Sequence, residues 1–158
     1  MTKLAVGDLA PEFNIEITNG KTVGLSDFKG KYLVVYFYTK DNTPGCTIEA
    51  KGFNSLKNEF DDLGAEILGI SKDSISSHDK FCDKYGLNFH LGSDVDGEIC
   101  QKFGTWVQKS MFGKKYMGIQ RATFLINPEG KIEHIWPSVS VSGHAEEVLD
   151  KIKAVKLT

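Results

Sequence analysis

The sequence predicts a single α/β domain built on a mixed β-sheet. Three observations support this fold class. The chain has 158 residues, the usual length of one domain. It contains no internal repeat, low-complexity segment or linker rich in proline and serine. Apolar, strand-like runs alternate with helical patterns, and a final hairpin and helix follow them. We therefore treat residues 1–158 as one domain.

The first predicted elements are an N-terminal β-hairpin and a buried strand. Residues 13–17 and 22–28 are expected to pair across the Asn19-Gly20 turn, because this dipeptide readily adopts positive φ. Residues 31–38 are apolar without alternation, which is typical of a central strand covered on both faces. This strand is the expected centre of the sheet.

The later elements alternate between helices and strands. Apolar residues recur at steps of three and four from Ala50 to Leu63, and Gly64 is placed to end that helix. Ser74 or Ser77 can cap the start of the next helix. The expected strands are 65–71, 87–94, 118–127 and 131–140, and the expected later helices are 74–85, 97–104 and 143–155.

Charge and hydropathy exclude several classes of function. The net charge of −2 comes from 19 basic and 21 acidic residues that are mixed along the chain, so no basic stripe indicates a nucleic-acid partner. The longest apolar run, residues 32–38, is too short to cross a membrane, and the first residues lack the apolar core of a secretory signal. Three cysteines cannot all pair within one chain. We expect a cytoplasmic protein.

Cys46 lies where the central strand gives way to a helix. Thr43 is a suitable N-cap and Pro44 suits the first helical position. Cys46 then falls in the first turn, where backbone N–H groups are unpaired and the helix dipole favours negative charge. Such a site stabilises a thiolate, which is the nucleophilic form. A small buried apolar residue would also suit this position, and spacing alone leaves both interpretations open.

The segment YTKDNTPGCTIEA, residues 38–50, resembles the active-site segment of the peroxiredoxins, specifically the bacterioferritin comigratory protein or peroxiredoxin Q branch. That family has the motif Pro-x-x-x-Thr-x-x-Cys on a thioredoxin-like fold, and Thr43 and Cys46 match its last two defined positions. The resemblance covers nearly the whole chain, through GDLAPEF, GIQRATFLINPEGKI and SGHAEEVL.

The resemblance implies a thiol peroxidase that needs no metal, flavin or haem. Cys46 would be the peroxidatic cysteine, which attacks a hydroperoxide and becomes a sulfenic acid. Thr43 would turn its hydroxyl toward the thiolate and the peroxide, and Arg121 would stabilise the negative charge. Glu49, one helical turn after Cys46, could hold the arginine or simply favour the helix N-terminus. We leave it outside the predicted catalytic set.

The chain departs from the family pattern at two places. Thr39 stands where the motif has proline, and we expect a looser pocket whose peroxidase chemistry survives. Many members carry a resolving cysteine five residues after the first, where this chain has Lys51, and others place it on the next helix. Cys82, 36 positions after Cys46, matches the second group, and Cys100 is the less favoured alternative.

A disulfide between Cys46 and Cys82 requires Cα atoms within about 4.4–6.8 Å, and the two cysteines are predicted on separate helices. We therefore expect the first turns of the Cys46 helix, and the Cys82 segment with it, to unwind on oxidation. The resemblance thus leads us to expect a monomeric or weakly associating peroxidase for hydrogen peroxide and organic hydroperoxides, recycled by thioredoxin or a similar dithiol. The alternatives are a one-cysteine peroxidase that uses an external thiol, and a non-catalytic redox sensor or binding module with the same fold.

Overall fold

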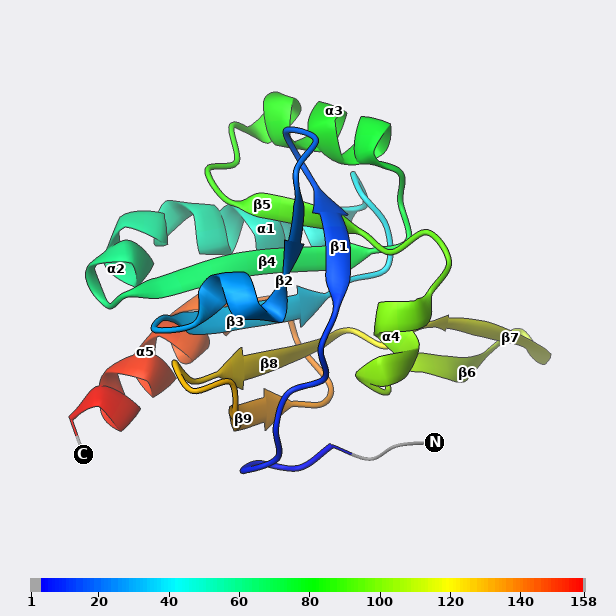
Figure 1. Cartoon of the computed structure of the whole chain (residues 1–158). Coiled ribbons are helices and arrows are strands. Elements are labelled where there is room, and N and C mark those ends of the chain that lie inside the picture. Colours follow the sequence, from blue (N-terminus) through cyan, green and yellow to red (C-terminus); the bar gives the residue numbers. More distant parts are fainter. Residues whose placement is uncertain (1–3, 158) are drawn as a thin grey trace.

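The computed structural model describes residues 4–157 and contains one seven-stranded mixed sheet with helices on both faces (Figure 1). The strand order is β2-β1-β5-β4-β3-β8-β9. The strands are β1 Asn14–Ile17, β2 Thr22–Gly24, β3 Tyr32–Phe37, β4 Ala65–Ser71, β5 His90–Ser93, β8 Ala122–Ile126 and β9 Ile132–Trp136. The helices are α1 Pro44–Ser55, α2 Lys57–Asp62, α3 Ile75–Tyr85, α4 Glu98–Lys102 and α5 His144–Lys156, with a 3₁₀ helix η1 at Leu25–Phe28.

The central strands are parallel where helices connect them. β3 pairs in parallel with β4, and β4 with β5, while β3 and β8 are antiparallel. Parallel neighbours need a crossover, which α1, α2 and α3 provide. The predicted α/β class and mixed sheet are therefore confirmed. The expected strand at 65–71 is observed with the same bounds.

Two apolar layers lie on opposite faces of this sheet. Along β3, alternate side chains enter different clusters: Leu33, Val35 and Phe37 join one, and Val34 and Tyr36 join the other. The first cluster is closed by α4, η1 and the N-terminal segment. The second cluster is closed by α1, α3 and α5, and it contains Cys46.

The N-terminal hairpin forms as predicted, but its second strand is short. β2 ends at Gly24, where the backbone N–H donates to the Asp27 carboxylate and η1 begins. The helix expected to run to Leu63 is divided at Leu56 into α1 and α2. The Ser55 hydroxyl bonds the Gly52 carbonyl there, which competes with the helical pattern.

A second hairpin, formed by β6 Trp106–Met111 and β7 Lys114–Ile119, was not predicted. It projects beside α4 in Figure 1. Its two-residue turn is Phe112-Gly113, and both residues have positive φ (52° and 79°). Phenylalanine is an unusual residue for this turn, and most hairpin side chains are exposed, so alternation gave no signal. The strand expected over 118–127 is consequently divided between β7 and β8.

No helix within residues 4–157 combines the length and apolar character needed to cross a bilayer. Among those residues, the three cysteines are free thiols.

Candidate active site

Cys46 is the third residue of α1, close to the carboxyl end of β3. Thr43 is the N-cap, with extended backbone angles (φ −92°, ψ 154°), and Pro44 is the first helical residue. Both positions agree with the sequence prediction. However, the Thr43 hydroxyl does not cap the helix; it donates to the Lys40 carbonyl over 2.9 Å. Cys46 is only 1% exposed.

Arg121 lies directly before β8 and reaches the Cys46 sulfur across the edge of the sheet. Its Nη2 donates to Cys46 Sγ over 3.2 Å. The approach is close to position 45, where a Cβ atom on Gly45 would lie 3.3 Å from Nη2 and would push the guanidinium by a few tenths of an ångström. The sequence prediction that Cys46, Thr43 and Arg121 converge is therefore consistent with the observed placement.

Glu49 is the second partner of Arg121. Its Oε1 accepts from Arg121 Nη1 over 2.7 Å, and its side chain is fully buried. Burial raises the pKa of Glu49 to about 7, although the charge of Arg121 opposes this rise. Its Oε2 is buried without a hydrogen-bond partner. The sequence analysis left Glu49 outside the catalytic set, because a carboxylate that simply favours the helix N-terminus explained it nearly as well.

The pKa of the Cys46 thiol is lowered even though the group is buried. Burial alone would raise this pKa, but hydrogen bonds from the Lys40 backbone and from the hydroxyls of Thr39 and Thr43, together with the charge of Arg121, outweigh burial. Thr39 Oγ1 lies 3.4 Å from the sulfur. The residue that replaces the motif proline is thus in direct contact with the thiol. The Thr43 hydroxyl has one proton, so donation to the sulfur requires it to turn from the Lys40 carbonyl.

Cys82 lies on α3, on the same face of the sheet as Cys46, and packs against the same apolar cluster. It is half-buried and lines a shallow surface pocket of about 620 Å³ together with Asp79 and Asp83. Burial and the nearby charges of Asp41, Asp79 and Asp83 raise the pKa of Cys82 to about 11. This thiol is therefore the weaker acid of the two.

Cys100 lies on α4, on the opposite face of the sheet, and is 0% exposed. Burial and the Asp94 carboxylate raise its pKa strongly. The sheet separates Cys100 from the cluster that contains Cys46 and Cys82. The complete burial of Cys100 is typical of a residue that packs in the core.

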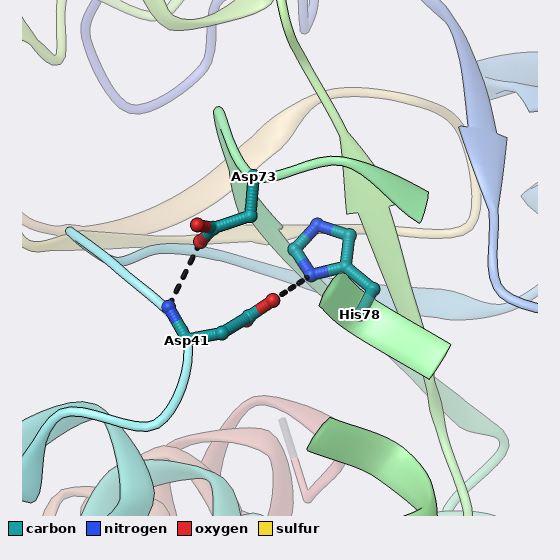
Figure 2. A group of neighbouring side chains, drawn as sticks. All are labelled: Asp41, Asp73 and His78. Carbon is teal, nitrogen blue, oxygen red and sulfur yellow. Dashed lines mark hydrogen bonds and ion pairs between the residues drawn. The ribbon is translucent and has the colours of Figure 1, made fainter. Parts of the chain in front are cut away.

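Asp41, Asp73 and His78 form the one group in residues 4–157 whose metal-ligating atoms lie within 4.8 Å of one another. Figure 2 shows that these side chains are joined by hydrogen bonds. His78 Nδ1 is 2.7 Å from Asp41 Oδ2, and Asp73 Oδ2 accepts from the Asp41 backbone N–H over 2.8 Å. Since these atoms already have partners, the group is a hydrogen-bonded network rather than an open metal site.

Chemically, the arrangement around Cys46 is suited to nucleophilic attack by sulfur. The thiolate is stabilised by a permanent cation and by several hydrogen-bond donors. The same donors can stabilise negative charge that develops on a bound oxygen. A separate pocket of about 260 Å³ lies at the other end of β3, near Leu33 and Pro128, and is lined by none of the cysteines.

Comparisons with known proteins agree with this geometry. The sequence pattern of the AhpC/TSA family matches residues 6–135. The chain is 43% identical to peroxiredoxin Bcp of Escherichia coli over 153 residues, covering 97% of this chain and 98% of the relative. It is 48% identical to peroxiredoxin Bcp of Xanthomonas campestris over 140 residues, covering 89% of this chain and 88% of the relative.

Solved structures give the same result. A mutant of Xylella fastidiosa PrxQ superposes with a TM-score of 0.93 at 41% identity, covering 99% of both chains. Peroxiredoxin Q of X. campestris superposes with a TM-score of 0.87 at 47% identity, covering 90% of both chains. These likenesses confirm the expected thioredoxin-like peroxiredoxin fold.

Proposed function

The chain belongs to the AhpC/TSA family, in the branch of the Bcp and Q peroxiredoxins, and from this premise we propose that it is a thiol-dependent peroxidase acting through Cys46. Its substrates are hydrogen peroxide and organic hydroperoxides. The observation that carries the proposal is the 3.2 Å contact between Arg121 Nη2 and Cys46 Sγ, at a buried thiol whose pKa is lowered. An X. campestris relative, the bacterioferritin comigratory protein, is described by its alkyl peroxide reduction activity, which supports the organic substrates.

In the first step, the Cys46 thiolate attacks one peroxide oxygen with an electron pair. The S–O bond forms, the O–O bond breaks, and the leaving oxygen takes a proton to become water or an alcohol. Cys46 is oxidised to a sulfenic acid, and the peroxide is reduced. Arg121 stabilises the charge that moves from sulfur to the leaving oxygen, and the Thr43 hydroxyl turns from Lys40 to donate to the peroxide. Glu49 fixes the guanidinium from its other side.

In the second step, the Cys82 thiol attacks the sulfenic sulfur, a disulfide forms, and water leaves. Cys82 shares a face of the sheet with Cys46, which supports this role over Cys100. Two solved mutants of X. campestris peroxiredoxin Q each replace one cysteine by serine, at positions 48 and 84 of that chain. These two cysteines are 36 positions apart, the same separation as Cys46 and Cys82. A dithiol reductant such as thioredoxin then opens the disulfide.

Steady-state turnover with thioredoxin, thioredoxin reductase and NADPH tests this function. We expect many peroxides to be consumed per chain, no consumption by Cys46→Ser, and loss of thioredoxin-supported turnover in Cys82→Ser. Equal turnover of wild type and Cys82→Ser with the same external thiol, and no turnover of either with thioredoxin, would indicate a one-cysteine peroxidase. If the wild-type chain is oxidised once and does not turn over with any thiol donor, it is a sensor and the proposed function is wrong.

A further inference from the structure

A buried hydrogen-bonded pair joins the segment before Cys46 to the helix that carries Cys82. Asp41 lies five residues before Cys46, and His78 lies one helical turn before Cys82. Asp41 Oδ2 is 2.7 Å from His78 Nδ1, and the two side chains are 3% and 0% exposed. Figure 2 shows the histidine of α3 pointing toward the Asp41 carboxylate.

Both ring nitrogens of His78 face hydrogen-bond acceptors. Nδ1 faces the Asp41 carboxylate, and Nε2 lies 2.9 Å from the carbonyl oxygen of Gly92 on β5. One proton lies between Nδ1 and the Asp41 carboxylate, and the contact at Nε2 adds a second hydrogen bond to the ring. A buried pair of this kind is costly to open, because either partner alone would be left uncompensated.

Further hydrogen bonds draw three segments onto Asp41. The Tyr38 hydroxyl donates to Oδ1, the Ser77 hydroxyl donates to Oδ2 over 2.8 Å, and the Asp41 backbone N–H donates to Asp73 Oδ2 over 2.8 Å. These partners come from the end of β3, the first turn of α3 and the connection between β4 and α3. Asp41 is thus the point at which the Cys46 loop is attached to the start of α3.

This attachment bears on the disulfide step of the proposed function, on which the inference rests. Cys46 and Cys82 are free thiols on two separate helices, and a disulfide requires their Cα atoms to approach closely. We expect α1 or α3 to unwind in part for that approach. Any such movement that separates residues 39–43 from α3 must first break the pair between Asp41 and His78.

We propose that Asp41 and His78 are positioning residues that hold the Cys46 loop on α3 in the reduced protein, and that opening of this pair controls how fast the Cys46 sulfenic acid meets Cys82. The pair has a second effect, because the same loop presents the Lys40 backbone and the Thr39 hydroxyl to the thiolate. Breaking it therefore slows peroxide attack and speeds disulfide formation. A variant that only lost stability would not slow peroxide attack and speed disulfide formation at the same time.

Stopped-flow fluorescence of the full chain, with one turnover of hydrogen peroxide, separates the two steps. Attack is the phase whose rate depends on peroxide concentration, and disulfide formation is the phase whose rate does not. In Asp41→Asn and in His78→Gln we expect disulfide formation about tenfold faster and attack a few-fold slower, consistent with weakened local attachment. The double variant is expected to match Asp41→Asn, because that change already removes the charged carboxylate through which His78 acts.

Asp94→Asn is the matched control, since it neutralises a buried aspartate that caps α4 on the opposite face of the sheet. We expect it to lower stability and leave both rates within a factor of about two. Disulfide formation that is unchanged or slower in both Asp41→Asn and His78→Gln overturns the proposal. So does an equal acceleration in Asp94→Asn, or an additive effect in the double variant.

Hydrogen exchange in the reduced protein tests the attachment without any peroxide. The amides of the first turns of α3 are expected to exchange about tenfold faster in Asp41→Asn than in wild type, and not faster in Asp94→Asn. If the wild-type chain forms no disulfide, the proposed resolving role of Cys82 is wrong, and this exchange experiment still decides whether the pair holds α3. Unchanged exchange in both Asp41→Asn and His78→Gln refutes the attachment itself.

Discussion

Two cysteines occupy the same position at the start of two different helices, and their chemistry is opposite. Cys46 is the third residue of α1, and Cys100 is the third residue of α4. Both are buried, at 1% and 0% exposure. The pKa of Cys46 is nevertheless lowered, while that of Cys100 is strongly raised.

The neighbouring charges explain the difference. At α4, the Asp94 carboxylate accepts the backbone N–H groups of Ile99 (3.1 Å) and Cys100 (2.8 Å), so these amides are occupied and a negative charge lies beside the thiol. At α1, the Thr43 hydroxyl turns to Lys40 instead of capping the helix, and the cation of Arg121 lies against the sulfur. A helix N-terminus therefore activates a cysteine only when its neighbours favour the thiolate.

The largest expected effect comes from removing each thiol in turn. Cys46→Ser should lower peroxide consumption by at least about 10³-fold, because the nucleophile is lost. Cys100→Ser should leave consumption within a factor of about two, since no step of the mechanism uses that thiol. Both variants can be measured in the thioredoxin-coupled assay. Equal losses in the two variants would show that the contrast between the helix starts has no chemical meaning.

Replacing Arg121 should make the Cys46 site resemble the Cys100 site. Arg121→Met is expected to slow peroxide attack by about 10²–10³-fold, the usual effect of losing one charge-stabilising donor. The thiol pKa should rise, so the rate should reach its plateau at a higher pH, because only the thiolate reacts. Thiolate absorbance near 240 nm against pH measures this shift. Arg121→Lys is the control, and it should retain more activity than the methionine variant, since the charge remains.

Glu49 gives a prediction about stability and pH. Its folded pKa of about 7 lies above its ordinary value of 4.5, so the folded protein holds this proton more tightly than the unfolded chain. The resulting stabilisation is present below pH 4.5 and is lost as pH rises through 7, by about 3 kcal/mol in the free energy of unfolding. Glu49→Gln should remove this dependence of the free energy of unfolding on pH. Urea unfolding at several pH values measures it, and identical slopes in both proteins would contradict the assignment.

Asp94→Asn should make the Cys100 site more like the Cys46 site. Loss of the charged cap is expected to destabilise the protein by about 1–2 kcal/mol. The pKa of Cys100 should fall, because the nearest negative charge is removed. Peroxide consumption should stay unchanged. Thiol titration in the Cys46→Ser, Cys82→Ser background isolates Cys100, and an unaltered Cys100 titration would show that burial alone sets its pKa.

The smallest effect is expected at Thr39. Thr39→Val keeps the branched shape and removes the hydroxyl that lies 3.4 Å from the Cys46 sulfur. Loss of one such hydrogen bond should slow peroxide attack roughly 2–10-fold. Stopped-flow rates for Thr39→Val and Thr39→Pro measure this directly. If both substitutions leave attack and over-oxidation unchanged, the hydroxyl contact and the looser pocket are both without consequence.

Local patterns predicted much of this molecule. The Thr43-Pro44 start of α1 and the cap of α3, where Ser74 accepts from the Ser77 N–H, were predictable because each depends on neighbouring residues. The helix break at Leu56 and the Phe112-Gly113 turn were not predictable. Leucine does not favour a helix end, and phenylalanine disfavours the positive φ that this turn requires.

The remaining features depend on contacts between distant residues. Arg121 and Glu49 are 72 positions apart, and Asp41 and His78 are 37 apart. Spacing can suggest that such residues are important, but only the fold shows which of them meet. The same reason explains why Asp94 was not recognised as the residue that distinguishes Cys100 from Cys46.

The most direct test of the contrast between the cysteines is intact mass and disulfide mapping after one equivalent of hydrogen peroxide, without reductant. We expect a loss of two hydrogens, a link between Cys46 and Cys82, and an unmodified Cys100. If oxygen is added to Cys46 alone, Cys46 is still the peroxidatic cysteine, but Cys82 does not resolve its sulfenic acid. An unreacted Cys46, or oxidation that begins at Cys100, would contradict the central claim that the neighbours of Cys46 make it the reactive thiol.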